Sequence, residues 1–208
     1  MFGKIKISLG NNASDKMVVY KNIEKFKRNI IVEVDSLHRA VIFKDNNVSQ
    51  VLDAGVYKPF TKQDKKCALS IVFVNISKSK EIFFTTRTAS IKDILSKTIY
   101  DCYFTGSYVI GVRNERKFLG TSNLSNTDFS LEDFAFSVEN EVNSQILSYI
   151  SQYFLINKIN VKDFEKEQLN IAKHILIELD KYLDNTYGLE VRTVNLDKIN
   201  IQNEILLN

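Results

Sequence analysis

Few side chains in this sequence could do chemistry, and their spacing matches no catalytic or metal-binding set. The two histidines, His38 and His174, lie far apart, so they form no metal-ligand pair. Cys67 and Cys102 lie in strand-like patterns beside bulky apolar residues, which is typical of buried structural thiols; a nucleophilic cysteine needs an activating base. A disulfide between them is the alternative. We therefore expect no catalytic residue, no metal and no cofactor.

The glycines and the carboxylates lead to the same expectation. Gly106 and Gly120 lack the neighbours of a phosphate-binding loop, a dinucleotide fingerprint or a nucleophile elbow. The acidic residues after residue 130 alternate with lysines and polar residues on the faces of two predicted helices, a pattern typical of solvated surfaces. A carboxylate-bridged pair of metal ions would need histidines beside them. The sequence therefore predicts a protein that is not an enzyme.

Composition limits the partners. The net charge of +3, from 28 basic and 25 acidic residues, is too balanced for a nucleic-acid-binding surface and allows weak attraction to anionic lipid. No apolar run approaches the ~18 residues of a membrane-spanning helix, and the first residues lack the apolar core of a secretory signal. We expect a cytoplasmic protein, peripheral at the inner face of the cell membrane if it meets the membrane.

The first half of the sequence predicts strands. Asp45-Asn46-Asn47 reads as a hairpin turn, because Asn and Asp tolerate positive φ. Gly106 interrupts a long β-rich stretch, where a bulge or sharp bend is expected. The run around Phe73 is apolar on both faces, which predicts a central strand. The predicted strands are 17–20, 30–34, 40–44, 48–52, 67–76, 81–86 and several within 94–113.

Two amphipathic helices and one strand follow. Ser130 is the expected N-cap of the first helix, with Asp133 three residues later. Apolar residues recur every four positions along this helix, and a second helix spans 161–184 and ends before Gly188. A returning strand covers 189–196. The inward side chains are predicted to be Phe134, Val138, Val142, Ile146, Ile150 and Phe154 in the first helix, Phe164, Leu169, Ala172, Ile175, Leu176, Leu179 and Leu183 in the second, and Leu189, Val191 and Val194 in the strand.

The amino-terminal segment has two interpretations. As a helix, it would place Phe2 and Ile5 on one face beside Lys4 and Lys6, a composition suited to contact with a membrane surface. As a strand, the same residues alternate between two faces. We favour the strand or arm, because so short a segment binds lipid weakly by itself.

Several short motifs occur in order along residues 16–201. Each one alone is a common strand or turn pattern, so only their order and spacing carry information. They are Val32-Glu33-Val34, Ala40-Val41-Ile42-Phe43, Leu52-Asp53-Ala54-Gly55, Ser70-Ile71-Val72-Phe73-Val74-Asn75, Tyr103-Phe104-Thr105-Gly106-Ser107-Tyr108, Arg116-Lys117-Phe118-Leu119 and Tyr187-Gly188-Leu189-Glu190-Val191.

In this order the motifs resemble the SPFH (band 7, prohibitin-like) domain, in particular its soluble bacterial, virion-core-protein-like branch. Three positions depart from the pattern: Asn47 stands where a turn glycine is usual, Ala54 where proline is common, and Thr85 where the branch has glycine. The resemblance implies an α+β fold with a mainly antiparallel, curved sheet in the first half, followed by the two helices and the returning strand.

The resemblance also implies a domain organisation and a role. Residues 1–15 would form an arm, 16–201 the SPFH-like domain (β-rich in 16–119, helical in 126–201), and 202–208 a tail that begins a helix. The role would be a non-enzymatic scaffold that self-associates and recruits membrane-associated proteins, in envelope stress for this branch. Two alternatives are a phage or mobile-element assembly protein with the same fold, and a small hydrolase or ligand-binding domain with an unrecognised site.

Overall fold

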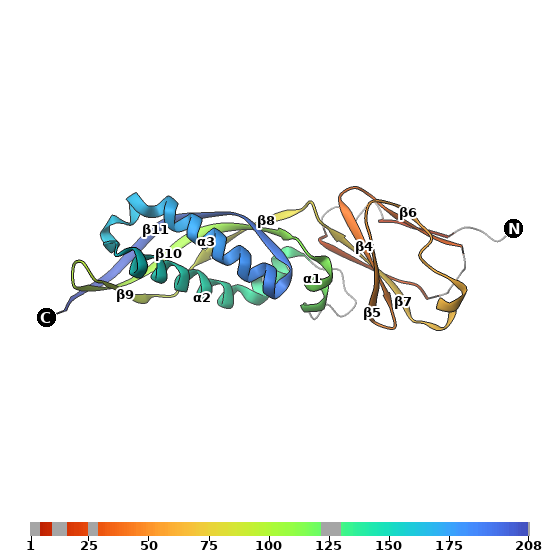
Figure 1. The fold of residues 1–208 in the computed structure, drawn as a ribbon, viewed down its shortest axis with the longest axis horizontal. Coiled ribbons are helices and arrows are strands. Elements are labelled where there is room, and N and C mark those ends of the chain that lie inside the picture. The colour runs from red at the N-terminus through yellow and green to blue at the C-terminus, as the bar shows by residue number, and fades with distance from the viewer. Residues whose placement is uncertain (1–4, 10–15, 25–28, 122–129, 208) are drawn as a thin grey trace. The chain divides into compact units, whose positions relative to one another are not determined.

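The computed structural model describes residues 5–9, 16–24, 29–121 and 130–207. Figure 1 shows the order of its elements. The strands are β1 (Ile5–Ile7), β2 (Val18–Asn22), β3 (Ile30–Val34), β4 (His38–Lys44), β5 (Asn47–Leu52), β6 (Gly55–Tyr57), β7 (Leu69–Asn75), β8 (Ser79–Thr85), β9 (Ala89–Asp93), β10 (Thr98–Val112) and β11 (Leu189–Leu206). The helices are η1 (Lys62–Lys66), α1 (Glu115–Thr121), α2 (Leu131–Asn157), η2 (Val161–Asp163) and α3 (Phe164–Tyr187), of which η1 and η2 are 3-10 helices.

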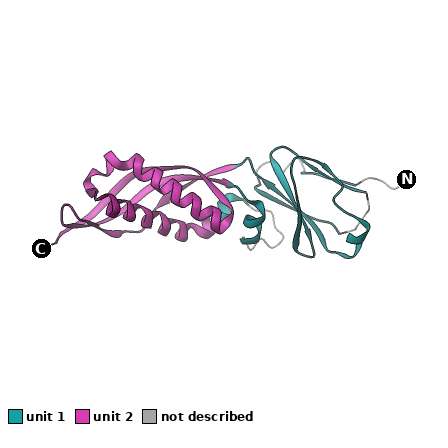
Figure 2. Cartoon of the chain, in the orientation of Figure 1, with its two compact units in different colours: residues 1–78, 112–134 teal, residues 79–111, 135–208 magenta. Residues whose placement is uncertain are grey.

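The predicted α+β class and order of elements are confirmed, but the strands of the first half are shared among three sheets rather than one. The chain divides into two compact units, shown in Figure 2. Unit 1 contains residues 1–78 and 112–134, and unit 2 contains 79–111 and 135–208. The predicted single domain over 16–201 stays a prediction. The long strand β10 lies almost entirely in unit 2 with most of α2 and with α3, because it belongs to the sheet that these helices cover.

Unit 1 contains two sheets. Strands β1, β3 and β6 form the first sheet, in which β1 runs parallel to β3. The second sheet is antiparallel and has the strand order β2-β7-β4-β5. Every residue of β7 is buried, which confirms the predicted central strand. Residues from both sheets form one apolar core, which contains Val19, Ile30, Val32, Val34, Ala40, Ile42, Leu52, Phe60, Leu69, Ile71 and Phe73.

The turn between β4 and β5 forms as predicted. Asp45 and Asn46 take φ values of 51° and 62°, the left-handed region that a tight hairpin requires and that Asn and Asp tolerate. The Asp45 carboxylate also accepts a hydrogen bond of 2.8 Å from the amide of Ala68. This turn therefore fixes the start of β7 as well as the hairpin.

Helix α1 was not predicted. The β-rich part was expected to run to residue 119, whereas Glu115–Thr121 is helical. Arg39 of β4 binds this helix through a 3.0 Å contact with the buried carboxylate of Glu115, and it also binds Asp53 at 3.0 Å. Phe118 is fully buried and packs on the ring of Phe134. These tertiary contacts stabilise a short helix whose apolar residues show little helical periodicity.

Unit 2 contains one sheet with the order β11-β10-β8, and β9 pairs with the amino-terminal part of β10. The pairing of β11 with β10 confirms that the final strand joins strands of the first half.

Both thiols are free, so the alternative disulfide between Cys67 and Cys102 is not formed. Burial, with a smaller contribution from Asp101, raises the pKa of Cys102 to about 12, which keeps this thiol protonated and inert.

Close packing explains Gly106, and the pairing of β10 with β8 contains no bulge at this glycine. The pairing of β10 with β8 runs without a register shift from Thr105 to Gly111. A Cβ at residue 106 would lie 2.2 Å from the carbonyl oxygen of Asn195 in β11 and 2.8 Å from the ring of Phe84. Only glycine fits here.

Helix α2 begins with the predicted cap. The Ser130 hydroxyl accepts a hydrogen bond from the amide of Asp133 at 3.1 Å, and the Asp133 carboxylate accepts one from the amide of Ser130, also at 3.1 Å. The predicted apolar stripe is buried except at Val138, which is half-buried. No helix of the described residues is long and apolar enough to cross a membrane.

Helix α3 ends where the sequence predicts. Gly188 takes a φ of 70°, and its amide donates to the carbonyl of Asp184 at 3.1 Å. One predicted inward residue was wrong: Leu169 is 67% exposed, and the neighbouring Ile171 is buried in its place. The remaining predicted inward residues are buried or half-buried.

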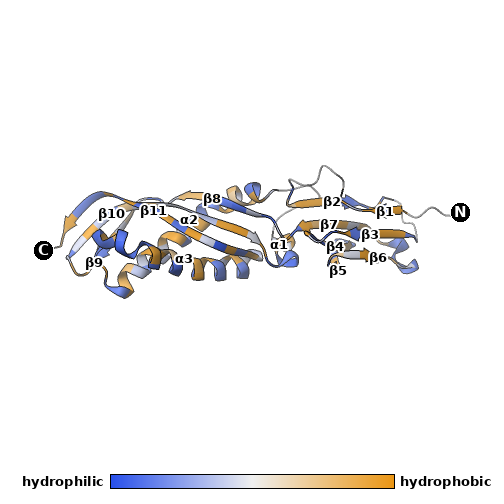
Figure 3. Cartoon of the chain, turned by 90° about the horizontal axis from the view of Figure 1, so that it is seen from above, coloured by the Kyte–Doolittle hydropathy of each residue, from blue (hydrophilic) through white to orange (hydrophobic). Residues whose placement is uncertain are grey.

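The carboxyl-terminal residues correct another prediction. We expected 202–208 to begin a helix, but Gln202–Leu206 continues β11, which is 18 residues long. Ile201, Ile205 and Leu206 are all exposed, and in Figure 3 the tip of β11 is hydrophobic after a hydrophilic stretch. The strand therefore extends beyond its well-buried first part with apolar residues on its surface.

Candidate interaction surface

Three groups of titratable side chains are candidates for chemistry, and the first contains His38. Its Nδ1 lies 2.6 Å from the carboxylate of Asp35, and its Nε2 is buried with no hydrogen-bond partner among the described residues. A catalytic histidine would hold a nucleophile at that second nitrogen. Asp35 also accepts from the amide of Leu37 at 2.9 Å, so the pair shapes the turn between β3 and β4.

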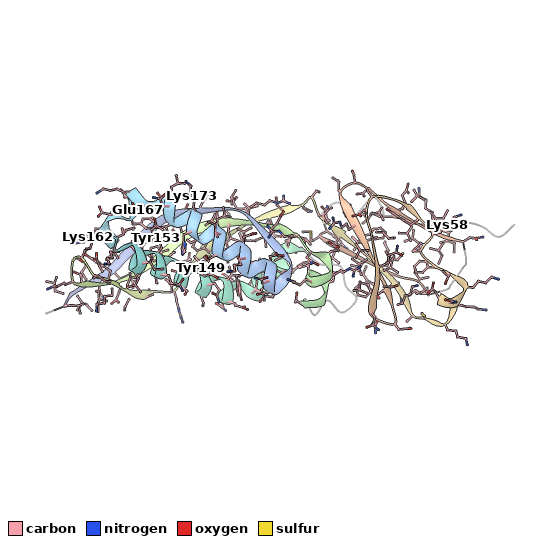
Figure 4. The ribbon with its side chains drawn as sticks, in the orientation of Figure 1. Lys58, Tyr149, Tyr153, Lys162, Glu167 and Lys173 are labelled. Carbon is pink, nitrogen blue, oxygen red and sulfur yellow. The ribbon has the colours of Figure 1, made fainter. Side chains whose placement is uncertain are left out.

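The second group lies between α2 and α3 (Figure 4). The ring of His174 packs against Tyr149 and Tyr153 at centroid distances of 6.5 and 5.6 Å. The Tyr153 hydroxyl donates to Glu167 at 3.1 Å. Burial raises the pKa of both tyrosines, and nearby carboxylates, Glu178 and Glu167, raise it further. The phenols therefore stay protonated, and the group holds two helices together rather than activating a nucleophile.

A third group joins the far ends of the same helices. Two hydroxyls, of Tyr182 and Tyr187, donate to the carboxylate of Glu141, the latter at 2.9 Å. Burial first, and then this carboxylate, raise the pKa of Tyr187 to about 12.

We expect Glu141→Ala to lower the pKa of Tyr187 toward its ordinary value near 10 without reaching it, because burial remains. Carbon-13 NMR of ring-labelled tyrosine over an alkaline titration measures the shift, and Tyr187→Phe assigns the resonance. An unchanged pKa in Glu141→Ala would show that the carboxylate has no influence on this phenol.

None of the described residues forms a group of three or more histidine, cysteine or carboxylate side chains placed to hold a metal ion.

The predicted membrane-contact residues are only partly described: Phe2 and Lys4 lie outside the described residues. Ile5 belongs to β1 and packs against the core of unit 1, while Lys6 faces outward and pairs with Glu33. The strand interpretation of this segment is thus the one observed, and lipid contact stays a prediction.

One exposed apolar surface of unit 2 lies on its sheet. On β10, Phe104 packs on Phe164 of α3, and Lys162 of η2 lies 5.7 Å from the ring centroid of Tyr100, so even-numbered residues face the helices. Odd-numbered residues of this strand face the other way. Phe83 of β8 pairs with Ser107 of β10, and the backbone hydrogen bond from Leu207 to Lys97 sets Ile201 and Ile205 opposite Tyr103 and Ile99. We define the open sheet face by these apolar residues, which point away from the helices: Phe83, Ile99, Tyr103, Ile201 and Ile205.

Phe83 is 73% exposed and Ile205 is 51% exposed, whereas Ile99 and Tyr103 are half-buried. Apolar side chains grouped on one face of a sheet mark a surface suited to a protein partner. The face is continuous with β11, whose outer edge offers backbone groups as well.

Strand β11 is at the end of its sheet, and in the described part of the chain β10 is the one strand that pairs with it. An edge strand presents unpaired N–H and C=O groups to which another strand can bind. We call residues 198–206 the free edge. The sequence analysis assigned residues 202–208 to the start of a helix, although Ile199, Ile201 and Ile205 occupy alternate positions as in a strand.

No protein-family model matches the sequence, and no curated protein matches it. The resemblance to SPFH domains therefore stays a prediction.

Proposed function

We propose that this chain is a non-enzymatic scaffold domain that binds protein partners, copies of itself included, along the free edge of β11. The observation that supports this role is the exposed carboxyl-terminal half of an 18-residue edge strand, next to the open sheet face. Main-chain groups on such an edge supply affinity, and alternate side chains supply selectivity. The resemblance to SPFH scaffolds agrees with this role.

Light scattering after size-exclusion chromatography tests the proposal. We expect the protein to form dimers or larger species at micromolar concentration, and Ile201→Lys/Ile205→Lys to shift it to the monomer, because lysine on an edge strand opposes strand addition. Ile177→Lys is the matched control, since Ile177 is 65% exposed on α3. A monomeric wild type, or dissociation by the control alone, would contradict the proposal.

The membrane part of the role rests on the resemblance and on the predicted contact at Phe2, Lys4, Ile5 and Lys6. Peripheral attachment at the inner face of the membrane would bring the scaffold to membrane-associated partners. We expect vesicles with anionic lipid to float the wild-type protein more efficiently than a variant without residues 1–10. Equal flotation of the two proteins would remove this segment from the proposal.

A further inference from the structure

We infer that the free edge of β11 pairs with the same edge of a second copy, antiparallel and with its two-fold axis at Ile201. This inference rests on the proposed function and specifies its partner and register. Three features of β11 support it: the direction of its backbone groups, the place where its edge becomes free, and the order of its charges.

The backbone direction follows from one hydrogen bond. The amide of Leu207 donates to the carbonyl of Lys97 at 2.8 Å, which sets residue 207 opposite 97 and residue 204 opposite 100. Lys162 agrees with this register, because it contacts both Glu204 at 2.9 Å and the ring of Tyr100. Alternate residues of a strand direct their backbone groups to the same side. The N–H and C=O groups of residues 198, 200, 202 and 204 therefore point to the free edge.

The edge becomes free just after a side chain that covers it. The amide group of Gln168 in α3 donates to the carbonyl of Leu196 and, at 3.1 Å, to that of Asp197. This contact occupies the strand before Lys198. The free edge is consequently about nine residues, or roughly 30 Å, long, which is ample for one added strand.

The side chains of this edge are complementary to themselves. With the axis at Ile201, Lys198 lies opposite the partner's Glu204, and the symmetry repeats this ion pair at the other end. Asn200 lies opposite the partner's Gln202, and Ile201 opposite the partner's Ile201. Moving the axis one residue, to Asn200 or Gln202, separates the two charges. Opposite charges directly across strands stabilise the pairing, and only this register provides two such pairs. Glu204 would then lie between the partner's Lys198 and Lys162 of its own chain, which it binds at 2.9 Å.

Pairing in this register would also cover exposed apolar surface. Ile201 and Ile205 belong to the open sheet face, where they are 37% and 51% exposed. The central pair of Ile201 side chains would fall at a non-hydrogen-bonded position, where facing Cα atoms are closest, about 4.5 Å apart. This geometry is within reach of a disulfide.

Cysteine trapping tests the register, in a Cys67→Ser background that leaves the buried Cys102 in place. We expect Ile201→Cys to form a disulfide-linked dimer under mild oxidation. Asn203→Cys is the matched control on the same strand: its two copies would lie roughly 13 Å apart and stay unlinked. A mixture of Ile199→Cys and Asn203→Cys chains should cross-link, because these positions face each other.

Charge exchange is the second test. We expect Lys198→Glu to weaken dimerisation about tenfold, since it places like charges opposite each other at both ends. Both this variant and the double variant Lys198→Glu/Glu204→Lys are compared in a Lys162→Ala background, because Lys162 binds Glu204 in the same chain and would oppose a lysine there. In that background the double variant should restore affinity to within about threefold of the unexchanged protein. Circular dichroism confirms that each variant is folded.

The outcomes separate the inference from the proposed function. Cross-linking at residue 201 with rescue by charge exchange supports both. A dimer by light scattering that links at 203 and not at 201, or that charge exchange does not rescue, overturns the register and leaves the scaffold role. A protein that is monomeric at every concentration overturns both.

Discussion

Replacing Gly106 with alanine is expected to lower the free energy of unfolding by about 2–3 kcal/mol, the range for side chains forced into well-packed interiors. The added methyl group would lie 2.2 Å from the carbonyl oxygen of Asn195, far inside van der Waals contact. Because that oxygen belongs to the backbone of β11, the strand itself would have to move. The nearby ring of Phe84 is buried against Tyr108, so it has little room to turn away.

Urea unfolding followed by circular dichroism measures the change, and Gly120→Ala is the matched control. No atom lies within 4 Å of a Cβ at residue 120, and this glycine lies in α1, so alanine should stabilise the protein by about 0.5–1 kcal/mol. Equal stability of Gly106→Ala and the wild type would mean that β10 and β11 are farther apart than described.

Local signals explain which elements could be predicted. The Ser130 cap, the Gly188 end of α3 and the turn at Asp45 are determined by residues next to one another, so the sequence identifies them. The strand β7 is apolar on both faces and is central for that reason. Each of these elements is determined by residues that are close to it in the sequence.

Long-range contacts explain what was missed. Leu169 and Ile171 are both apolar and lie two positions apart, and packing against other parts of unit 2 decides that Ile171 is the buried one. Helix α1 depends on the contact between Arg39 and Glu115, residues that are distant in sequence. The role of Gly106 depends on Asn195 in another strand. A single sequence contains none of these pairings.

The strand that carries the candidate surface could be predicted from the sequence, but its position at the edge of the sheet could not. Residues 198–205 alternate polar and apolar side chains, interrupted only at Asn203, and this period of two indicates a strand. What the sequence does not contain is that β11 lies at the end of the sheet, with no second neighbour among the described strands. The edge, and hence the binding surface, is a property of the topology.

The second large effect concerns Asp64, a carboxylate that is only 5% exposed. It accepts hydrogen bonds from the amide of Thr61 at 2.7 Å and from Lys44 at 2.6 Å, so it joins the start of η1 to the end of β4. Burial alone would raise the pKa of Asp64, but the hydrogen bonds from Lys44 and Thr61 outweigh it and lower the pKa below its usual value.

We therefore expect Asp64→Asn to lower the free energy of unfolding at pH 7 by about 2 kcal/mol, within the range for hydrogen bonds to charged groups. Because the folded-state pKa of Asp64 is lowered, its contribution is fully present above the unfolded pKa of about 3.9 and is lost as the pH falls through the folded value. The difference in the free energy of unfolding between Asp64→Asn and the wild type should thus shrink from pH 5 downward. Urea titrations between pH 7 and pH 2.5 measure this difference in the free energy of unfolding. Asp53→Asn is the control, because Asp53 is 77% exposed and its ion pair with Arg39 contributes at most about 1 kcal/mol. A difference that stays constant down to pH 2.5 would mean that the carboxylate charge does not stabilise this junction, and that the shape of the side chain alone holds η1 against β4.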